Sequence, residues 1–230
     1  MTPMLRLDWC SHAAAKYAVT HWHYSRSMPT PPVVHLGVWE TDQFCGVLLF
    51  SRGSNNNQLR PYSLHCTEGC ELTRVALRGH HTPVSRLLRI ACLLVHRSQP
   101  GLRLIISYAD PFYGHHGGIY QAAGWLYSGQ TDTDTAYRDA TGRMWHSRAV
   151  SATGLTRYYG RPRRVPRFDA CTKVPLPGKH RYLYPLDAAM HAQLLPLAQP
   201  YPKRASSSVS AAPVHPAGEG GATPTEALRL

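Results

Sequence analysis

Asp110 has both the residue type and the position to do chemistry. It follows Leu102 to Tyr108 (LRLIISY), an apolar run typical of a buried strand, and open α/β sheets bind ligands at the carboxyl ends of their strands. A carboxylate in this position could orient an amine nucleophile or take its proton. The alternative is a structural role, in which Asp110 caps the helix expected from Gly117.

The residues that follow Asp110 favour a ligand site. The run HHGG at 115–118 would let a ligand approach the backbone closely, because glycine has no side chain. Tyr120, one helical turn on, could give a proton to a leaving group, although a core tyrosine with one satisfied hydroxyl is the more frequent case. We therefore predict that the segment from Tyr108 to Gly129 carries the site.

A second candidate is the loop from Arg78 to Pro83, between a predicted strand at 70–77 and a predicted helix. Thr82 is expected as the N-cap and Pro83 as the first helical residue. The first helical turn has unpaired N–H groups that attract phosphate, and Arg78 and the Ser85 hydroxyl would add to this. The alternative is an ordinary connection between a strand and a helix.

His21, His23 and Tyr24 form a third polar group, in a turn that Pro29 prevents from continuing as a helix. His23 could bind a metal ion, such as iron, together with His115. Two histidines in an irregular turn do not by themselves define a coordination geometry. The sequence has no Walker motif, GxSxG or HExxH, and no helix-turn-helix or zinc-finger pattern.

The elements that must position these residues alternate in type. Helices are predicted over 12–22, after Pro83 and over 117–125, and strands over 33–40, 43–51, 70–77, 102–108, 126–131 and 180–187. This order predicts an α/β layer with a mostly covered central sheet. One domain over residues 1–200 is expected, followed by a disordered tail at 201–230 that is rich in Ala, Ser, Pro and Gly.

The charge of the chain points to a polyanionic partner. Its 230 residues carry 25 Lys and Arg against 13 Asp and Glu, a net charge of +12. Arginine outnumbers lysine, as bidentate contact with phosphate favours, although a basic and inert surface is the alternative. The basic, proline-rich segment 161–181 holds the candidate nucleic-acid contacts, which are Arg161, Arg163, Arg164, Arg167, Lys179 and Arg181.

The compartment is predicted from what the sequence does not contain. The first residues lack the apolar stretch of a signal peptide, and no run approaches the roughly 20 apolar residues that span a bilayer. We therefore expect a cytoplasmic protein with reduced cysteines and no membrane contact.

Four blocks carry a family resemblance: HWHYSRSMP, ELTRVAL with the serine-bearing helix after it, ISYADPFYGHHGGIYQAAGWLYSGQT, and GKHRYLYPLD. Spread over residues 9 to 187, they resemble the Mom family of phage DNA-modification proteins. The resemblance implies a GNAT (acetyltransferase-like) fold, α/β with a mixed, mostly antiparallel central sheet flanked by helices. It also implies conversion of the exocyclic amine of adenine in DNA to a carbamoylmethyl derivative, which protects phage DNA from host restriction.

The resemblance also implies roles for particular residues. Asp110 would be the base or the orienting carboxylate, Tyr120 a proton donor, and His23 and Tyr24 would hold the adenine or complete the site. Arg74 and Ser85, with Arg78 and Thr82 of the loop, would hold the donor. Double-stranded DNA would lie along the basic segment 161–181. The target base must leave the duplex, so a stacking aromatic is expected, with Trp22, Tyr113 and Trp125 as candidates.

The donor has two candidates. The GNAT fold normally binds the pyrophosphate of coenzyme A with a Q/R-x-x-G-x-G/A loop, and here Arg78 to Pro83 keeps a single glycine. A carbamoylmethyl group also contains a nitrogen that an acetyl group does not supply. The donor could therefore be an acyl-coenzyme A or a glycyl-tRNA, and in the second case the positive charge would serve two nucleic acids.

Two other functions remain open at this stage. One is an N-acetyltransferase acting on a small amine or a protein, which would bind coenzyme A and ignore DNA. The other is a non-enzymatic DNA-binding accessory protein, whose salt-dependent binding would survive Asp110→Asn.

Overall fold

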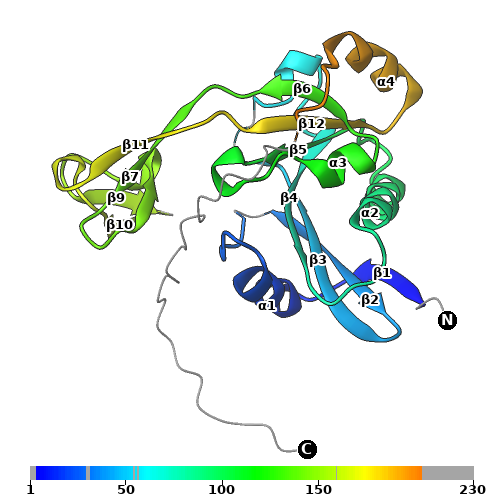
Figure 1. The fold of residues 1–230 in the computed structure, drawn as a ribbon, viewed down its shortest axis with the longest axis horizontal. Coiled ribbons are helices and arrows are strands. Elements are labelled where there is room, and N and C mark those ends of the chain that lie inside the picture. The colour runs from blue at the N-terminus through cyan, green and yellow to red at the C-terminus, as the bar shows by residue number, and fades with distance from the viewer. Residues whose placement is uncertain (1–3, 30–31, 54, 56, 159, 204–230) are drawn as a thin grey trace, which may run out of the picture.

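A seven-stranded sheet forms the centre of the computed structural model, which describes residues 4–29, 32–53, 55, 57–158 and 160–203 (Figure 1). In spatial order its strands are β1 (Leu5–Trp9), β2 (Val33–Glu40), β3 (Gln43–Ser51), β4 (Gly69–Leu77), β5 (Leu104–Ala109), β12 (His180–Pro185) and β6 (Leu126–Gln130). Neighbouring strands are antiparallel except for β4 and β5. The prediction of a mixed, mostly antiparallel sheet is confirmed.

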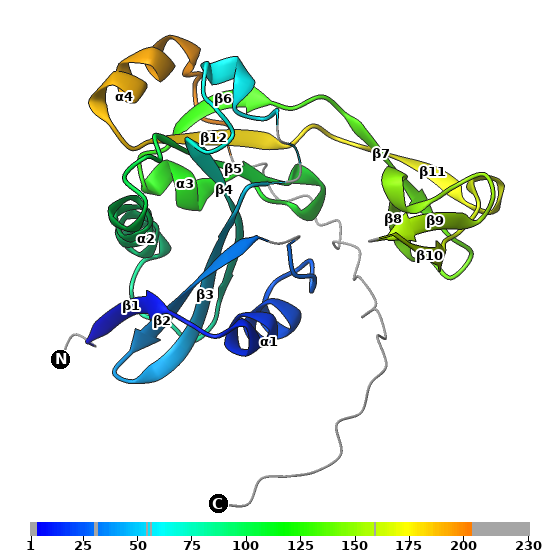
Figure 2. The ribbon, with the colours of Figure 1, turned by 180° about the vertical axis from the view of Figure 1, so that it is seen from behind.

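Helices cover both faces of this sheet (Figures 1 and 2). On one face, α2 (Val84–Ser98) and α3 (Gly118–Ala122) pack on alternate residues of β3 such as Leu48 and Phe50. On the other face, α1 (His12–Trp22) packs on Val47 and Leu49, and α4 (Ala188–Leu194) packs further along the sheet. Neighbouring residues of a strand point to opposite faces, so each strand contributes to a core on both sides of the sheet. The predicted central sheet is thus covered by helices on both faces.

The two parallel strands separate along their length. β4 and β5 pair only from Gly69 to Glu71 and from Leu104 to Ile106. At the next position the Ser107 Oγ, rather than a backbone group, donates to the carbonyl oxygen of Leu72 at 2.8 Å. The remainder of β4 pairs with β3 alone, so a gap in the sheet opens toward the carboxyl ends of β4 and β5.

The chain between β6 and β12 forms a separate arm that projects from the sheet (Figures 1 and 2). It contains a three-stranded sheet of β11 (Thr172–Leu176), β7 (Asp134–Arg138) and β8 (Met144–His146), and a two-stranded ribbon of β9 (Leu155–Tyr158) and β10 (Arg161–Arg164). At its base, the backbone N–H of Thr131 donates to the carbonyl of Lys179 at 2.9 Å. The predicted basic segment 161–181 thus contains β10 and β11, which the sequence did not predict.

Several element bounds need correction. Helix 12–22 and strands 33–40 and 43–51 match their predicted bounds, whereas the helix expected over 117–125 covers only Gly118–Ala122. The cap of α2 is Pro83 without a side-chain hydrogen bond, so Thr82 as N-cap is wrong. The expected tail lies outside the described residues from 204 onward, and the single domain over 1–200 stays a prediction. Among the helices of the described residues, none is long and apolar enough to cross a membrane.

Candidate functional site

A cavity of about 690 Å³ occupies the gap between β4 and β5, within the usual size range of small-molecule sites. Its walls come from the turn after α1, the carboxyl halves of both strands and the start of α3. The polar residues among them are His23, Tyr24, Thr73, Arg74, His80, Tyr108, Asp110, His115, His116 and Tyr120. Segments far apart in the sequence therefore meet at one site.

Asp110 lies at the mouth of the cavity and is only 8% exposed. Its Oδ1 accepts from the backbone N–H of Phe112 at 3.0 Å, which caps the short 3-10 turn Pro111–Tyr113. Its Oδ2 lies 3.6 Å from the Nζ of Lys179 at the base of the arm. Asp110 thus caps the turn directly after it, and not the helix from Gly117 that the structural alternative expected, and it also lines the cavity.

The start of α3 is shaped for close approach. Gly117 has a φ of +84°, and a Cβ there would overlap the ring of Tyr182. The hydroxyl of Tyr182 donates to the carbonyl of His116 at 2.6 Å and so holds this turn against β12. The close approach expected at these glycines is between Gly117 and the ring of Tyr182. Gly117 and Gly118 also line the cavity.

His23 is held as a neutral ring with one defined tautomer. Burial, and then the positive charges of Arg74 and His115, lower its pKa to about 3. The backbone N–H of Ser25 donates to His23 Nδ1 at 3.1 Å, and the Ser25 Oγ lies 2.8 Å from the same nitrogen. Because Nδ1 accepts, the ring proton is on Nε2, and His23 can donate a hydrogen bond at neutral pH.

Arg74 connects β4 to the turn after α1. Its Nε donates to the carbonyl oxygen of Ser27 at 3.0 Å, and its Nη1 donates to that of Thr73 at 2.7 Å. These two bonds fix the guanidinium beside the cavity, where its positive charge can face a negative or developing negative charge.

Tyr120 is buried next to the point where the strands separate. The hydroxyl of Ser107 has one proton, which it donates to the carbonyl oxygen of Leu72. In the 2.7 Å contact between the hydroxyls of Ser107 and Tyr120, Tyr120 is therefore the donor. Burial raises the pKa of Tyr120 above its ordinary value. The hydroxyl can still accept a hydrogen bond, and its role as proton donor to a leaving group stays a prediction.

The aromatic rings around Asp110 form a cluster. Tyr24 lies 4.7 Å from Tyr113 and 5.0 Å from His115 between ring centroids, and it is 43% exposed. Trp22 lines the cavity, as expected of an aromatic that could stack on a base. Trp125 is completely buried in the core, so it cannot contact a ligand and that expectation is wrong.

The residues present do not fit a metal ion well. Nδ1 of His23 is already an acceptor for Ser25, and the ring of Tyr24 contacts both His23 and His115. Within the described part of the chain, no three His, Cys, Asp or Glu side chains gather as a ligand set. We therefore derive no chemistry from iron or another metal.

The loop between β4 and α2 is organised around Glu40, at the end of β2. Its carboxylate accepts from the backbone N–H groups of His81 and Thr82, each at 2.7 Å. Arg78, Thr82 and Ser85, expected to bind the donor, are not among the residues that line the cavity, whereas Arg74, His80 and Val84 are. No feature of the sequence indicated Glu40, because it pairs with residues more than 40 positions away.

The expected nucleic-acid residues divide between the arm and its base. Arg161, Arg163 and Arg164 are exposed on β10, and Arg167 forms an ion pair with Asp169 at 2.6 Å. At the base, Lys179 faces Asp110, while Arg181 lies partly buried on β12. The basic segment is therefore attached directly to the cavity.

Comparison of the sequence with known proteins identifies its family. The profile of the Mom protein family matches residues 4–203, most of the chain. The chain belongs to the Mom protein family. A relative from Escherichia phage Mu, named methylcarbamoylase mom, is 26% identical over 152 residues, which cover 64% of this chain. The match spans 62% of the length of that relative.

Solved structures with a similar fold include acetyltransferases, the class implied by the sequence resemblance. The N-acyl amino acid synthase FeeM from uncultured soil microbes has a TM-score of 0.47 and 11% identity, covering 85% of this chain and 96% of its own. The spermidine/spermine N-acetyltransferase SpeG from Vibrio cholerae, solved with manganese, has a TM-score of 0.42 and 9% identity, covering 82% and 96%. A Bacillus subtilis acetyltransferase solved with CoA reaches 0.39 at 10% identity, covering 80% and 100%. At these scores the likeness carries no conclusion about ligand or reaction.

Proposed function

We propose that this member of the Mom family is a transferase that converts the exocyclic amine of adenine in DNA to its carbamoylmethyl derivative. The observation that carries the proposal is the buried carboxylate of Asp110, which meets His23 and Arg74 around one cavity. The name of the phage Mu relative supports the same reaction class. In a phage, this activity would protect the DNA from host restriction, and the enzyme would act in the host cytoplasm.

Four polar side chains at the cavity have a part in this proposal. Asp110 takes the proton that the adenine amine loses as it attacks an acyl carbon. His23 donates from Nε2 to the carbonyl oxygen, where negative charge develops, and the guanidinium of Arg74 stabilises the same charge. Tyr120 completes the wall and is hydrogen-bonded to Ser107, which bridges the two strands at the end of their pairing.

A glycyl ester accounts for every atom of the product. The adenine amine attacks the ester carbonyl, an amide bond forms, the alcohol of the carrier leaves, and the proton lost by the amine restores that alcohol. The free amine of the new glycyl group then attacks the ring carbon that bears the amide. When the original bond from that carbon to nitrogen breaks, the carbamoylmethyl derivative remains, with no oxidant or further reactant consumed.

The arm would bring DNA to the cavity. Arg161 and Arg164 of the ribbon are exposed, and Lys179 links the base of the arm to Asp110. A base inside a duplex must be flipped out before it can react, at a cost of a few kcal/mol. Trp22 and the exposed ring of Tyr24 lie at the cavity, where they can stack on that base.

Mass spectrometry of nucleosides from the DNA of cells that express the protein tests the proposal. Carbamoylmethyl-adenine is expected with wild type and not with Asp110→Asn. Unmodified DNA from wild-type cells would contradict the proposal. Coenzyme A binding without any effect on DNA would favour an N-acetyltransferase of another substrate. DNA binding without modification would favour an accessory protein.

A further inference from the structure

The buried carboxylate of Glu40 occupies an unusual position for a charged group. Glu40 ends β2, is 4% exposed, and reaches across to the loop that precedes α2. The backbone N–H groups of His81 and Thr82 both donate to it at 2.7 Å, one to each carboxylate oxygen. Burial alone would raise the pKa of Glu40, but a hydrogen bond from the Thr82 side chain, these two backbone bonds and the nearby charge of His81 lower it to about 2. Glu40 is therefore a fixed internal anion.

This anion takes two of the backbone donors that a phosphate at this loop could use. The usual phosphate site of such a loop is made by free N–H groups of the loop and of the first helical turn, together with the helix dipole. Within residues 78–82, the N–H groups of His81 and Thr82 go to Glu40, and that of Arg78 goes to the carbonyl of Cys45 at 2.9 Å. Three of the five donors in this stretch are thus committed inside the protein.

We infer that Glu40 takes the place of a bound diphosphate, so that this enzyme does not recognise its acyl donor through coenzyme A. The inference rests on the proposed function and narrows its donor to an aminoacyl ester of RNA. A diphosphate at the loop would meet a buried carboxylate of like charge, together with donors already paired. The donor would instead be held near the separated strands, by Arg74 and His23, and its carrier by the basic surface.

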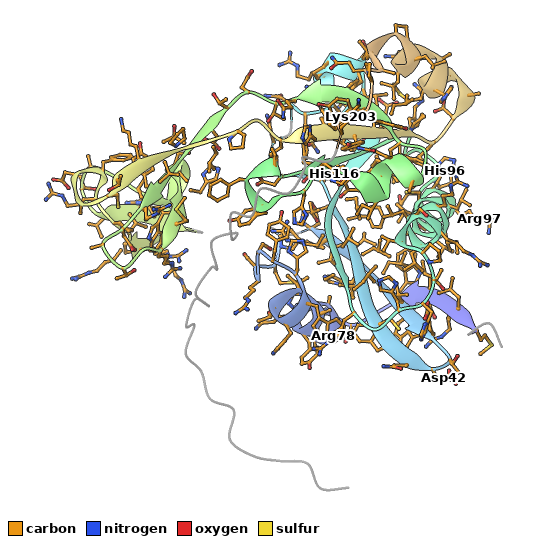
Figure 3. All side chains as sticks on the ribbon, viewed as in Figure 1. Asp42, Arg78, His96, Arg97, His116 and Lys203 are labelled. Atoms are coloured by element: carbon orange, nitrogen blue, oxygen red, sulfur yellow. The ribbon has the colours of Figure 1, made fainter. Side chains whose placement is uncertain are left out.

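Ligand binding tests this directly. Calorimetry would compare wild type, Glu40→Ala, Glu40→Gln and the control Asp42→Asn, using inorganic pyrophosphate, coenzyme A and pantetheine. Asp42 is exposed in the adjacent turn, so its substitution removes the same charge without touching the loop; its place at the tip of the β2–β3 hairpin is labelled in Figure 3. Pantetheine carries the thiol arm of coenzyme A without the diphosphate.

Wild type and Asp42→Asn are expected to bind pyrophosphate undetectably, and to bind coenzyme A no more than about threefold better than pantetheine. The Glu40 variants should gain pyrophosphate binding by at least about tenfold, because the negative charge is lost and Glu40→Ala frees both N–H groups just before α2, while Glu40→Gln frees one. Glu40→Gln keeps one amide oxygen as acceptor and covers the case in which Glu40→Ala does not fold. Wild type binding coenzyme A about thirtyfold or more tightly than pantetheine would overturn the inference.

A donor assay separates this inference from the proposed function. Purified wild type and DNA would be incubated with glycyl-tRNA or with glycyl-coenzyme A, and the nucleosides would be weighed. Modification from glycyl-tRNA alone is expected. Modification from glycyl-coenzyme A at an equal rate would overturn the inference while supporting the proposed function. Modification from neither donor would count against the proposed function. The pyrophosphate measurements on the Glu40 variants would still test the role of Glu40.

Discussion

Two regions at the same cavity differ in how the protein uses their polar groups: the loop between β4 and α2, and the cavity wall between β4 and β5. In the loop between β4 and α2, the N–H groups of His81 and Thr82 donate to Glu40, and all three groups are satisfied inside the protein. In the cavity between β4 and β5, Ser25 fixes Nδ1 of His23 while the ring still lines the cavity. Asp110 also lines it, with Phe112 on one carboxylate oxygen and the exposed Lys179 near the other.

This difference indicates which polar groups stabilise the fold and which are available for the reaction. A charged group that is buried with all its partners inside the protein stabilises the fold, whereas a polar group that the protein holds at the wall of a cavity is positioned and remains available. Substitutions in the cavity should therefore change the reaction more than the stability, and substitution of Glu40 should do the opposite.

Asp110→Asn is the strongest test of the cavity half of this comparison. We expect DNA modification to fall by about 10³-fold, because an amide cannot accept the proton of the attacking amine. The amide oxygen can still accept from Phe112, so the melting temperature should change little. The control is Asp132→Asn in the arm, an exposed acid. If a nucleoside digest shows that Asp110→Asn still modifies DNA, Asp110 is not the general base of the reaction.

His23 is expected to show a smaller effect with a distinct signature. His23→Ala should lower the modification rate by about 10²-fold, as for the loss of a donor to developing charge. His23→Gln, which can place an N–H near the position of Nε2, should recover part of that loss. Because the pKa of His23 is lowered to about 3, the wild-type rate should show no inflection from this residue between about pH 5 and 8. An equal loss in both variants would argue against donation from Nε2.

Glu40→Gln should mainly affect stability. Replacing a carboxylate that accepts two N–H bonds should cost about 2 kcal/mol of unfolding free energy in denaturant titrations. The pKa of Glu40 is lowered from 4.5 to about 2 on folding, so its contribution is complete above about pH 4.5 and is lost as the pH falls toward about 2. The stability gap between wild type and variant should therefore close over that range. A gap independent of pH would show that the charge of Glu40 is not what stabilises the loop.

The arm should have the smallest effect, on binding alone. Arg161→Gln with Arg164→Gln should weaken DNA binding by about tenfold and reduce the salt dependence by up to about 2 in log–log slope. The control, Arg86→Gln with Arg97→Gln, makes the same charge change on exposed positions of α2, away from the arm (Figure 3 labels Arg97). Equal losses in both pairs would mean that overall charge, and not the ribbon, holds the DNA.

The sequence predicted those features that depend on neighbouring residues. Ser11 caps α1 through the N–H of Ala14, and the Thr41-Asp42 turn joins β2 to β3, so both regions were predicted with correct bounds. Asp110 was predicted as a site residue because the apolar strand before it marks where it must lie. These signals are local, and the structure adds little to them.

Features that depend on distant residues were missed. Glu40 and Thr82 are 42 positions apart, and no periodicity indicates such a pair. Strands β7 to β11 are short, and β10 and β11 contain Pro162 and Pro175, so alternation could not distinguish these strands from a loop. Ser107, whose hydroxyl bridges β5 to β4 where their backbone pairing ends, has no sequence signal that distinguishes it from any serine in a strand.

If the arm binds DNA as proposed, its base makes DNA contact separable from chemistry in evolution. Gln130 and His180 are paired neighbours on β6 and β12, and the backbone of Thr131 bonds to that of Lys179 at 2.9 Å, so the arm leaves and re-enters the sheet at one point. A two-residue hairpin could join these strands directly. Relatives could therefore lengthen, lose or exchange the arm, and with it their preferred DNA targets, while the cavity stays unchanged.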